Sequence, residues 1–356
     1  MSAQAAAPGV AGDPRRVEAT RMFREAAEAA DCVRTQIEGN AALQARLGAR
    51  LRGLRPRALV TCARGSSDHA ATFARYLAET RLGLLSSSIS PSVSSVYGVR
   101  QDLGGCLFLA FSQSGRSPDL IAAAESAARA GAVVVALVND PDSPLARAAS
   151  EVLPLHAFPE TGVAATKSYI AMLAASLQLI AAWSGDAALG ASIHAAPALL
   201  ERAWALDWSA GLEPLAGAEH LLVVGRGLGL SIAQEAALKL KETCGLHAEA
   251  FSGAELRHGP MALVGPTVPV FAFLQDDATR AGLERLARDL LATGVPLILA
   301  GGALDGALNL PSLVCEPQLA PMLQALSFYR LANALAAARG LDPDAPPGLA
   351  KVTETR

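Results

Sequence analysis

Short apolar segments alternate along this chain with longer segments in which apolar residues recur every three or four positions. The first kind, such as Leu107–Phe111, is typical of strands that are buried on both faces. The second kind, such as the segment that starts at Thr20, is typical of helices with one apolar face. Further strands are expected at 57–62, 132–138, 152–155, 220–224, 268–273, 296–300 and 310–315. Further helices are expected at 69–80, 118–130, 143–149, 167–183, 196–206, 280–292 and 319–338, and one more is expected to begin near residue 231. Because strands and helices alternate, the pattern predicts an α/β fold with parallel sheets.

The alternation stops near residue 185 and starts again near residue 220, which predicts two domains in tandem. The turn at 64–67, where arginine and glycine follow a strand, has a counterpart at 225–229, and this similarity indicates an internal duplication. The segments that we expect are a disordered tail at 1–17, an N-terminal helical segment at 18–50, a first domain at 51–190, a connection at 191–216, a second domain at 217–340 and a C-terminal tail at 341–356.

The polar loop after the strand at 107–111 is the strongest candidate for a binding site. Ser112, Gln113 and Ser114 follow the strand directly, and Ser117 then fits the N-cap of the next helix. Free backbone N–H groups and the positive end of the helix dipole would point at one place, which favours an anion such as phosphate. An ordinary strand-to-helix turn has the same pattern, so the residues alone leave both interpretations open.

A second loop of the same kind, which contains Ser66 and Ser67, follows the strand at 57–62. A glycine followed by two serines is, by itself, typical of any turn. The carboxyl ends of neighbouring parallel strands meet at one edge of a sheet, however, so we expect both loops to contribute to one ligand site.

Composition and charge exclude several classes of protein. With 51% hydrophobic residues in 356 the chain is not disordered, and a net charge of -3 with scattered basic residues gives no footprint for nucleic acid. The longest near-apolar stretch, 170–183, is shorter than the about 20 residues needed to span a bilayer. The first 17 residues lack the apolar core of a secretion signal. We therefore expect a cytoplasmic protein without a membrane partner.

The cysteines and glycines give no sign of a metal or a redox cofactor. The five cysteines are widely spaced and form no CxxC pair, which is typical of reduced core residues. The glycine-rich turn at 225–229 has no acidic residue at the spacing that a dinucleotide ribose needs.

Ionisable residues gather in the second half of the chain. Lys239 and Glu242 lie three residues apart on one face of the helix that starts near 231, and such pairs are usually solvated surface. The segment 247–263 contains two histidines and two glutamates in what we expect to be one irregular stretch. So many ionisable residues in a loop favour a functional site.

Five motifs together carry a family resemblance: SQSGRSPD at 112–119, ETGVAATK at 160–167, EAALKLKE at 235–242, HAEAFSGAELRHGP at 247–260 and LAK at 349–351. With them the chain resembles the tandem sugar isomerase (SIS) domain family. It is similar to the isomerase half of glutamine:fructose-6-phosphate amidotransferase and to the related glucosamine-6-phosphate deaminases. The resemblance covers nearly everything after residue 20. It implies two flavodoxin-like, doubly wound parallel sheets with helices on both faces.

The resemblance also implies which residues bind the substrate. Those that would hold the sugar phosphate are Ser66, Ser67, Ser112, Gln113, Ser114 and Ser117, and those that would line the sugar are Val163, Ala165 and Ala350. At the position of Ala165 relatives carry serine, so this chain lacks one hydroxyl there.

Four residues match the catalytic positions of the family. Glu242 would move a proton between C1 and C2 with Lys239 beside it, and Lys351 would form a Schiff base with the sugar ketone. His258 would open the sugar ring from the other subunit of a homodimer. A carboxylate suits the proton transfer because one group must reach both carbons, and an imidazole suits ring opening because it titrates near neutrality. No metal or redox cofactor is required.

The start of the chain favours one member of the family. The amidotransferases begin with a glutaminase domain whose nucleophile is a cysteine directly after the initiator methionine, whereas residue 2 here is Ser2. We therefore expect the deaminase direction, in which glucosamine 6-phosphate and water give fructose 6-phosphate and ammonia. The alternatives are an aldose–ketose isomerase, a glutamine-independent homologue of the aminotransferase or a deaminase of another amino sugar, and, in a different class, a sugar-phosphate-sensing regulator.

Overall fold

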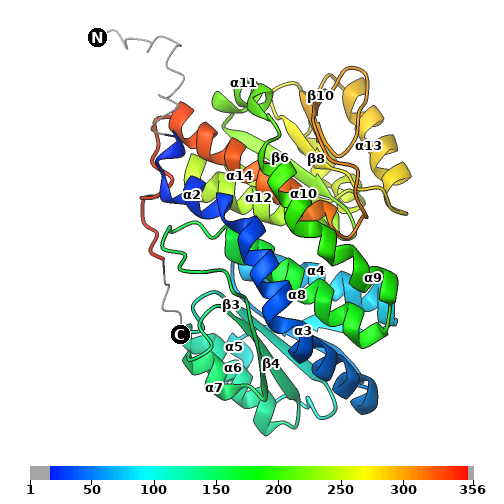
Figure 1. Cartoon of the computed structure of the whole chain (residues 1–356). Helices are drawn as coiled ribbons and strands as arrows, with labels where there is room; N and C mark the ends of the chain where they lie inside the picture. Colours follow the sequence, from blue (N-terminus) through cyan, green and yellow to red (C-terminus); the bar gives the residue numbers. More distant parts are fainter. Residues whose placement is uncertain (1–16, 352–356) are drawn as a thin grey trace.

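The computed structural model describes residues 17–351, and it contains two five-stranded sheets that are separated by a band of helices (Figure 1). The tail expected at 1–17 lies, apart from Val17, outside the described residues, as do residues 352–356. No helix within residues 17–351 is long and apolar enough to cross a membrane.

The first sheet has the strand order β2-β1-β3-β4-β5, and all its pairings are parallel. Its strands are β1 (Leu59–Cys62), β2 (Ser86–Ser88), β3 (Leu107–Ser112), β4 (Val133–Val138) and β5 (Glu151–Pro154). Every residue of β1 and β3 is buried, which explains why the two central strands are almost continuously apolar in sequence.

The second sheet has the order β10-β9-β8-β6-β7 and is also parallel. Its strands are β6 (His220–Gly225), β7 (His247–Ser252), β8 (Val270–Phe273), β9 (Leu297–Ala300) and β10 (Leu308–Leu310). Counted from its own first strand, this sheet has the order 2-1-3-4-5, as the first sheet does. Both sheets therefore have the flavodoxin-like topology, and the predicted fold class is confirmed.

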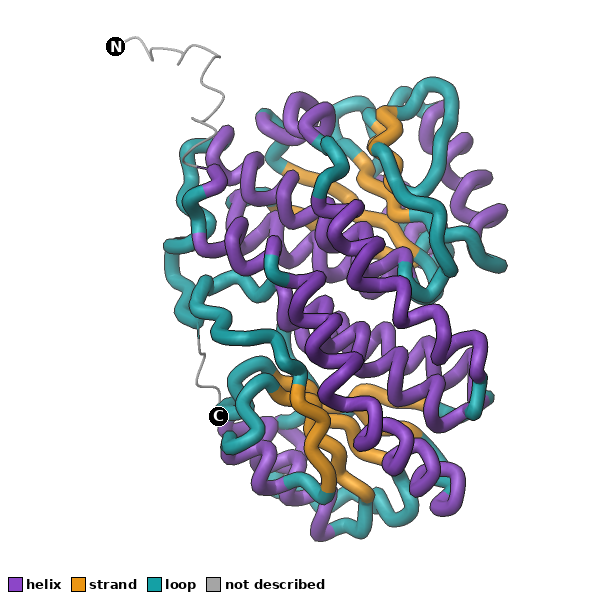
Figure 2. Tube along the Cα trace, in the orientation of Figure 1, coloured by secondary structure: helices purple, strands orange, loops and turns teal. Residues whose placement is uncertain are grey.

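Helices cover both faces of each sheet, and Figure 2 shows that many of them lie in the band between the sheets. The longer helices are α2 (Arg21–Ala27), α3 (Ala29–Leu54), α4 (Ser66–Leu82), α6 (Pro118–Arg129), α8 (Lys167–Ser184), α10 (Ala196–Trp204), α12 (Gly229–Cys244), α13 (Arg280–Ala292) and α14 (Ala320–Ala338). The shorter helices are α5 (Ser92–Ser95), α7 (Pro144–Ala148), α9 (Ala187–Ser192) and α11 (Leu212–Ala216).

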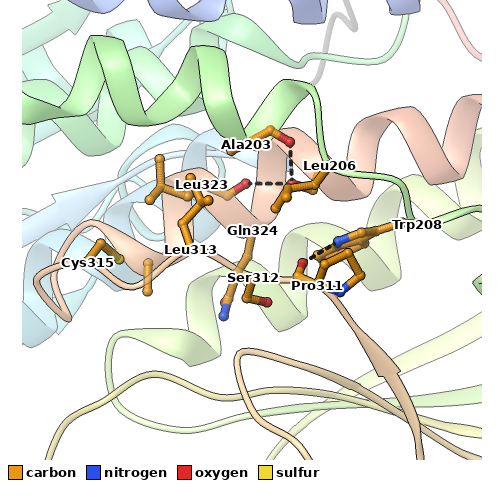
Figure 3. A pocket seen from close by; sticks show the side chains of 11 residues that line it. Ala203, Leu206, Trp208, Pro311, Ser312, Leu313, Cys315, Leu323 and Gln324 are labelled. Carbon is orange, nitrogen blue, oxygen red and sulfur yellow. Dashed lines mark hydrogen bonds between the residues drawn. The ribbon is translucent and has the colours of Figure 1, made fainter.

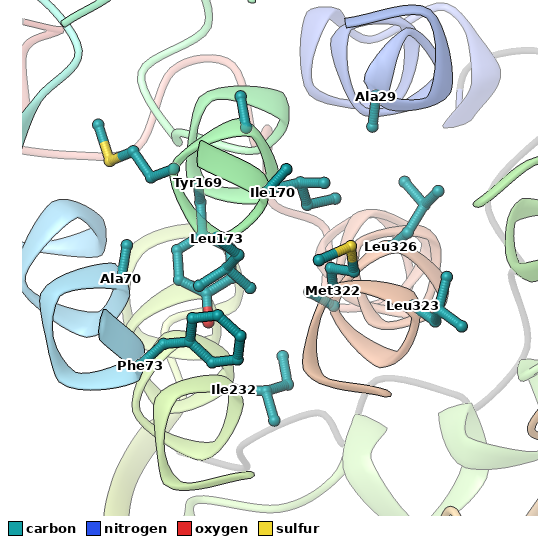
Figure 4. Close-up of a cluster of buried hydrophobic side chains, with 14 of the residues drawn as sticks. Ala29, Ala70, Phe73, Tyr169, Ile170, Leu173, Ile232, Met322, Leu323 and Leu326 are labelled. Atoms are coloured by element: carbon teal, nitrogen blue, oxygen red, sulfur yellow. The ribbon is translucent and has the colours of Figure 1, made fainter. Parts of the chain in front are cut away.

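The inner faces of the two sheets share one hydrophobic core. A single cluster of buried side chains runs from Met22 to Ala336, and two smaller clusters lie on the outer faces. In Figure 4, Phe73 of α4, Ile232 of α12 and Met322 of α14 converge in this shared core. The two halves are therefore packed through a common interior, which fixes the loops of the first half relative to α12 of the second.

The structure differs from the expected local structure in three places. The segment 247–263 is not one irregular stretch, because its first six residues form the edge strand β7, in which Ala248 is buried and Glu249 is exposed. The strand expected at 310–315 ends at Leu310, since Pro311 has no N–H for a ladder hydrogen bond. Strand β2 was not predicted because it consists of three serines and carries no apolar signal.

A small cavity of about 20 Å³ lies between α10, α14 and the chain after β10 (Figure 3). Trp208 Nε1 donates to the carbonyl oxygen of Pro311 at 2.8 Å, and Ser327 Oγ donates to that of Ala203 at 2.8 Å. These bonds tie α10 to the second half. The cavity has room for about one water molecule and is too small for a substrate.

Candidate active site

A larger cavity of about 310 Å³ opens at the carboxyl ends of β1 and β3, where the strand order of the first sheet reverses. Its walls come from the loops after β1 and β3, the segment before α8, helix α12 and the C-terminal tail. The predicted site residues that line this cavity are Ser66, Ser67, Ser112, Gln113, Ser114, Ser117, Val163, Ala165, Lys239, Glu242, Ala350 and Lys351. The structure thus brings together every predicted site residue except His258.

The loop after β3 presents hydroxyl groups to the cavity. Ser112 Oγ accepts a hydrogen bond from the N–H of Gly115 at 3.0 Å, and Ser114 Oγ accepts one from the N–H of Arg116 at 3.3 Å. A hydroxyl that accepts still has its own proton to donate, which suits contact with a phosphate oxygen. Gly115 has φ +63°, and a Cβ there would lie 2.1 Å from Ser143 Oγ, so only glycine fits.

An ion pair that was not predicted from the sequence joins the loop after β1 to the start of α6, the helix that follows the loop after β3. Arg64 Nε and Nη2 both donate to Asp119 Oδ2, at 3.0 and 2.8 Å. Asp119 is only 2% exposed, so its charge is held in place by this arginine. Arg64 also lines the cavity, where its positive charge would attract a phosphate.

Lys239 and Glu242 are not a solvated surface pair. Lys239 is 1% exposed, and its Nζ lies 2.5 Å from Glu242 Oε2 and 3.5 Å from Glu235 Oε1. Burial alone would lower the pKa of Lys239, but the carboxylates of Glu235 and Glu242 outweigh it and raise that pKa above its ordinary value. Lys239 therefore holds its positive charge next to the carboxylate that faces the cavity.

Glu235 is a second buried carboxylate that sequence analysis did not place in the site. Ser66, His69, Lys239 and Tyr329 all contact its two oxygens. Burial would raise its pKa, but the charge of Lys239 and the contact with His69 outweigh burial and lower the pKa. Its spacing of four residues from Lys239 was the one signal that could have revealed it, because residues at that spacing share a helix face.

Lys351 of the tail is held by Glu160. Its Nζ lies 3.2 Å from Glu160 Oε2, and the same carboxylate accepts from Ser168 Oγ at 2.6 Å and from the N–H of Thr166 at 2.9 Å. Burial would raise the pKa of Glu160, but Lys351 and these hydrogen bonds outweigh it and lower the pKa. Glu160, the first residue of the ETGVAATK motif, is thus a fixed anchor for the tail.

The segment before α8 is in turn anchored by α2. Glu25 Oε1 accepts from the N–H groups of Thr161 at 2.6 Å and of Gly162 at 3.1 Å. Lys167 is fully buried and donates to Glu28 Oε2 at 2.5 Å. Val163 and Ala165, which line the cavity, are therefore positioned by carboxylates from the N-terminal helices.

His258 is the one predicted catalytic residue that does not line this cavity. It is exposed at the end of the 3-10 turn Glu255–His258, and it lines a different cleft of about 520 Å³ together with Arg226, Arg257, Arg285 and Arg288. The prediction that it acts on the cavity of a partner subunit is untested.

Among residues 17–351 no group of three or more His, Cys, Asp or Glu side chains is placed to hold a metal ion. The cysteines of the first half are buried, and burial raises the pKa of Cys32 and of Cys62 to about 12. These two thiols therefore stay protonated, as expected of core residues.

Fold and site together define a doubly wound α/β protein with a cavity, lined by serine hydroxyls, at the switch point of its first sheet. The family model of the SIS domain matches residues 55–182 and 214–300, which contain β1 to β5 and β6 to β9. The chain belongs to the SIS domain family.

Similar proteins extend this result. The glutamine–fructose-6-phosphate aminotransferase of Symbiobacterium thermophilum is 35% identical in an alignment of 323 residues. The alignment covers 85% of this chain and 52% of that protein. The chain thus spans about half the length of the curated relatives it matches, and it is homologous to their isomerase half.

Two solved structures are also similar. A Silicibacter pomeroyi protein that is provisionally described as a phosphosugar isomerase is 41% identical, with a TM-score of 0.87 over 91% of this chain and 100% of its own. The C-terminal domain of glucosamine-fructose-6-phosphate aminotransferase from Francisella tularensis is 26% identical, with a TM-score of 0.83 over 92% and 98% of the two chains.

Proposed function

We propose that this protein moves a proton between C1 and C2 of a sugar 6-phosphate, and that its reaction converts glucosamine 6-phosphate and water into fructose 6-phosphate and ammonia. The observation that carries the proposal is the arrangement of one cavity. Two hydroxyl-lined loops form one end, and Glu242, Lys239 and Lys351 lie in the remaining wall.

The loops after β1 and β3 suit the phosphate group. Serine hydroxyls, the side chain of Gln113 and the guanidinium of Arg64 offer donors there, and the N-terminus of α6 points at the same place. Val163, Ala165 and Ala350 leave room for the carbon chain of the sugar, which places C1 and C2 toward α12.

Glu242 and Lys239 can carry out the proton transfer between them. Glu242 removes the C2 proton of the open-chain aldehyde while Lys239 lends a proton to the C1 oxygen, which gives an enolamine. Glu242 then returns its proton to C1, and Lys239 regains one from the iminium nitrogen at C2. Water adds to the C2 imine and ammonia leaves, so both side chains end in their starting states.

Lys351 offers a second and faster route for the same step. Its amine can attack the C2 imine and expel ammonia, and the resulting Schiff base is then hydrolysed to the ketone. His258 of a partner subunit is the proposed ring-opening group, since none of the histidines within residues 17–351 lines the cavity of its own chain. The names of the relatives, which refer to fructose 6-phosphate, support the choice of substrate.

An ammonia-release assay tests the proposal. The protein is incubated with glucosamine 6-phosphate, galactosamine 6-phosphate, unphosphorylated glucosamine and glucose 6-phosphate, and ammonia and ketose are measured. We expect equal amounts of ammonia and fructose 6-phosphate from glucosamine 6-phosphate. Ketose from glucose 6-phosphate with no ammonia from any sugar would instead identify an aldose–ketose isomerase. Binding of sugar phosphates without turnover would identify a regulator.

A further inference from the structure

Glu235 lies behind the wall of the candidate active site and contacts two parts of it. The side chain is fully buried on α12, four residues before Lys239. Its Oε1 is 3.1 Å from Ser66 Oγ, 3.1 Å from the Tyr329 hydroxyl and 3.5 Å from Lys239 Nζ. Its Oε2 is 2.9 Å from His69 Nδ1. One buried carboxylate therefore joins the loop after β1 to the lysine of the catalytic ion pair.

Ser66 cannot serve Glu235 and a phosphate at the same time. A serine hydroxyl has one proton, and here it is donated to Glu235. In the proposed reaction the same hydroxyl faces the phosphate, whose ionised oxygens also need a donor. Binding of the phosphate therefore takes one donor away from Glu235 Oε1. A buried carboxylate that loses a donor gains stability by recruiting another one.

Lys239 is the donor that can replace Ser66. Its Nζ is 2.5 Å from Glu242 Oε2 and 3.5 Å from Glu235 Oε1, so a small rotation of the side chain exchanges one carboxylate for the other. The two glutamates differ in environment, because Glu235 is fully buried and the side chain of Glu242 is 21% exposed. The buried carboxylate needs the lysine more once Ser66 has turned away.

We propose that Glu235 is a positioning residue that couples occupation of the phosphate loop to the release of Glu242 from Lys239. The inference rests on the proposed function. Without phosphate, Lys239 is held close to Glu242, and a carboxylate in a tight ion pair is hindered as a base. With phosphate bound, Lys239 turns one N–H toward Glu235, and both oxygens of Glu242 become available to the C2 proton. The other N–H groups of Lys239 remain for the C1 oxygen. The enzyme therefore readies its base only when a phosphorylated sugar is present.

The test uses unphosphorylated fructose as the substrate in deuterium oxide. Inorganic phosphate is added as a separate component. Exchange of deuterium into C1 is followed by NMR. For the parent protein we expect saturating phosphate to accelerate exchange about 10-fold or more, the effect of one charge-assisted hydrogen bond. Ser66→Ala permanently removes one of the two hydroxyl donors of Oε1 and leaves Tyr329 and Lys239, so its exchange without phosphate should exceed that of the parent and respond less than 2-fold to phosphate.

Ser114→Ala is the matched control, because Ser114 lines the same phosphate end and has no contact with Glu235. In this variant, half of the maximal acceleration should need a higher phosphate concentration than in the parent. The acceleration at saturating phosphate should equal that of the parent. A Ser66→Ala protein that is accelerated like the parent would overturn the coupling, and so would a parent protein that does not respond to phosphate.

A crystal structure of the parent protein with bound inorganic phosphate provides a readout that does not depend on turnover. We expect Ser66 Oγ to contact the phosphate and Lys239 Nζ to lie closer to Glu235 than to Glu242. Lys239 still paired with Glu242 beside a bound phosphate would contradict the coupling. Failure of the proposed function looks different, since fructose 6-phosphate itself would then show no exchange at C1.

Discussion

Glu242 is the side chain on which the proposed proton transfer depends, and it differs from its neighbours on α12. It reaches the cavity from the side of the helix on which Lys239 is buried, whereas Lys241 points to solvent. The same short segment thus supplies one residue of the cavity wall and one ordinary surface position.

Replacing Glu242 with glutamine should remove the base and keep the shape of the side chain. We expect kcat for ammonia release to fall by a factor of about 100 to 10,000, with a much smaller change in KM, because the phosphate contacts lie at the other end of the cavity. Lys241→Gln is the matched control on the same helix and should keep the parental kcat. Exchange of solvent deuterium into C1 at the parental rate in Glu242→Gln would contradict the assignment.

At this scale the sequence predicted the residues whose chemistry is visible in a short motif. The serines of the two loops, Glu242 and Lys351 line one cavity, as expected from their motifs. It did not predict the pairing of Arg64 with Asp119 or of Glu160 with Lys351. Those contacts join residues that are distant in sequence, and only the folded chain brings them together.

Among the elements, the C-terminal tail is held at two distant places in the fold. Asp344 accepts from the N–H groups of Arg21 and Met22, at 2.6 and 2.9 Å, and thereby caps the start of α2. Seven residues later, Lys351 contacts Glu160 in the cavity wall. The tail contains no helix or strand in its described part, yet it is fixed at both points.

Lys351→Ala should therefore abolish most of the turnover and leave the fold intact. The reason is chemical, since the amine that forms the Schiff base is lost while both sheets and the core remain. Borohydride with fructose 6-phosphate should label the parent protein and not the mutant. Lys351→Arg is the matched control, because it keeps a cation for Glu160 and has no amine for a Schiff base. Parental activity in Lys351→Arg would rule out the covalent route.

Element types were easier to predict than element limits. Buried central strands such as β3 are continuous apolar runs, so the pattern identifies them directly. The edge strands β2, β7 and β10 carry weak patterns, because at most one residue of each is buried. Edge strands take their positions from the neighbouring strand rather than from their own composition.

At the scale of the whole molecule, the two halves behave as one body because they share an interior. The helices α4 and α8 of the first half pack with α12 and α14 of the second in one buried cluster. His258 lies in the cleft with Arg226 and Arg257, which is separate from the cavity that Glu242 lines. The fold of a single chain thus does not place His258 in the wall of its own cavity.

We therefore expect His258 to act on the cavity of a second copy. Mixing His258→Ala with Glu242→Gln subunits should give each mixed dimer about half of the parental activity, because one of its two sites is then complete. A random mixture, in which about half of the dimers are mixed, should show about a quarter of the parental activity. Each mutant alone should remain inactive under the same conditions. A different affinity tag on each mutant, used in two successive purification steps, isolates the mixed dimers. Mixed dimers without any recovery of ammonia release would place both residues in one subunit's site.

The cap that Asp344 forms on α2 also bears on how the protein is made. The two partners are separated by 322 residues, so a ribosome that adds about 5 to 20 residues per second needs roughly 15 to 65 seconds between them. During that time α2 has emerged and its first N–H groups have no cap. The last contact to form at the start of α2 is therefore the one with the tail, so the helix should begin to be fully protected only after residue 344 has left the ribosome.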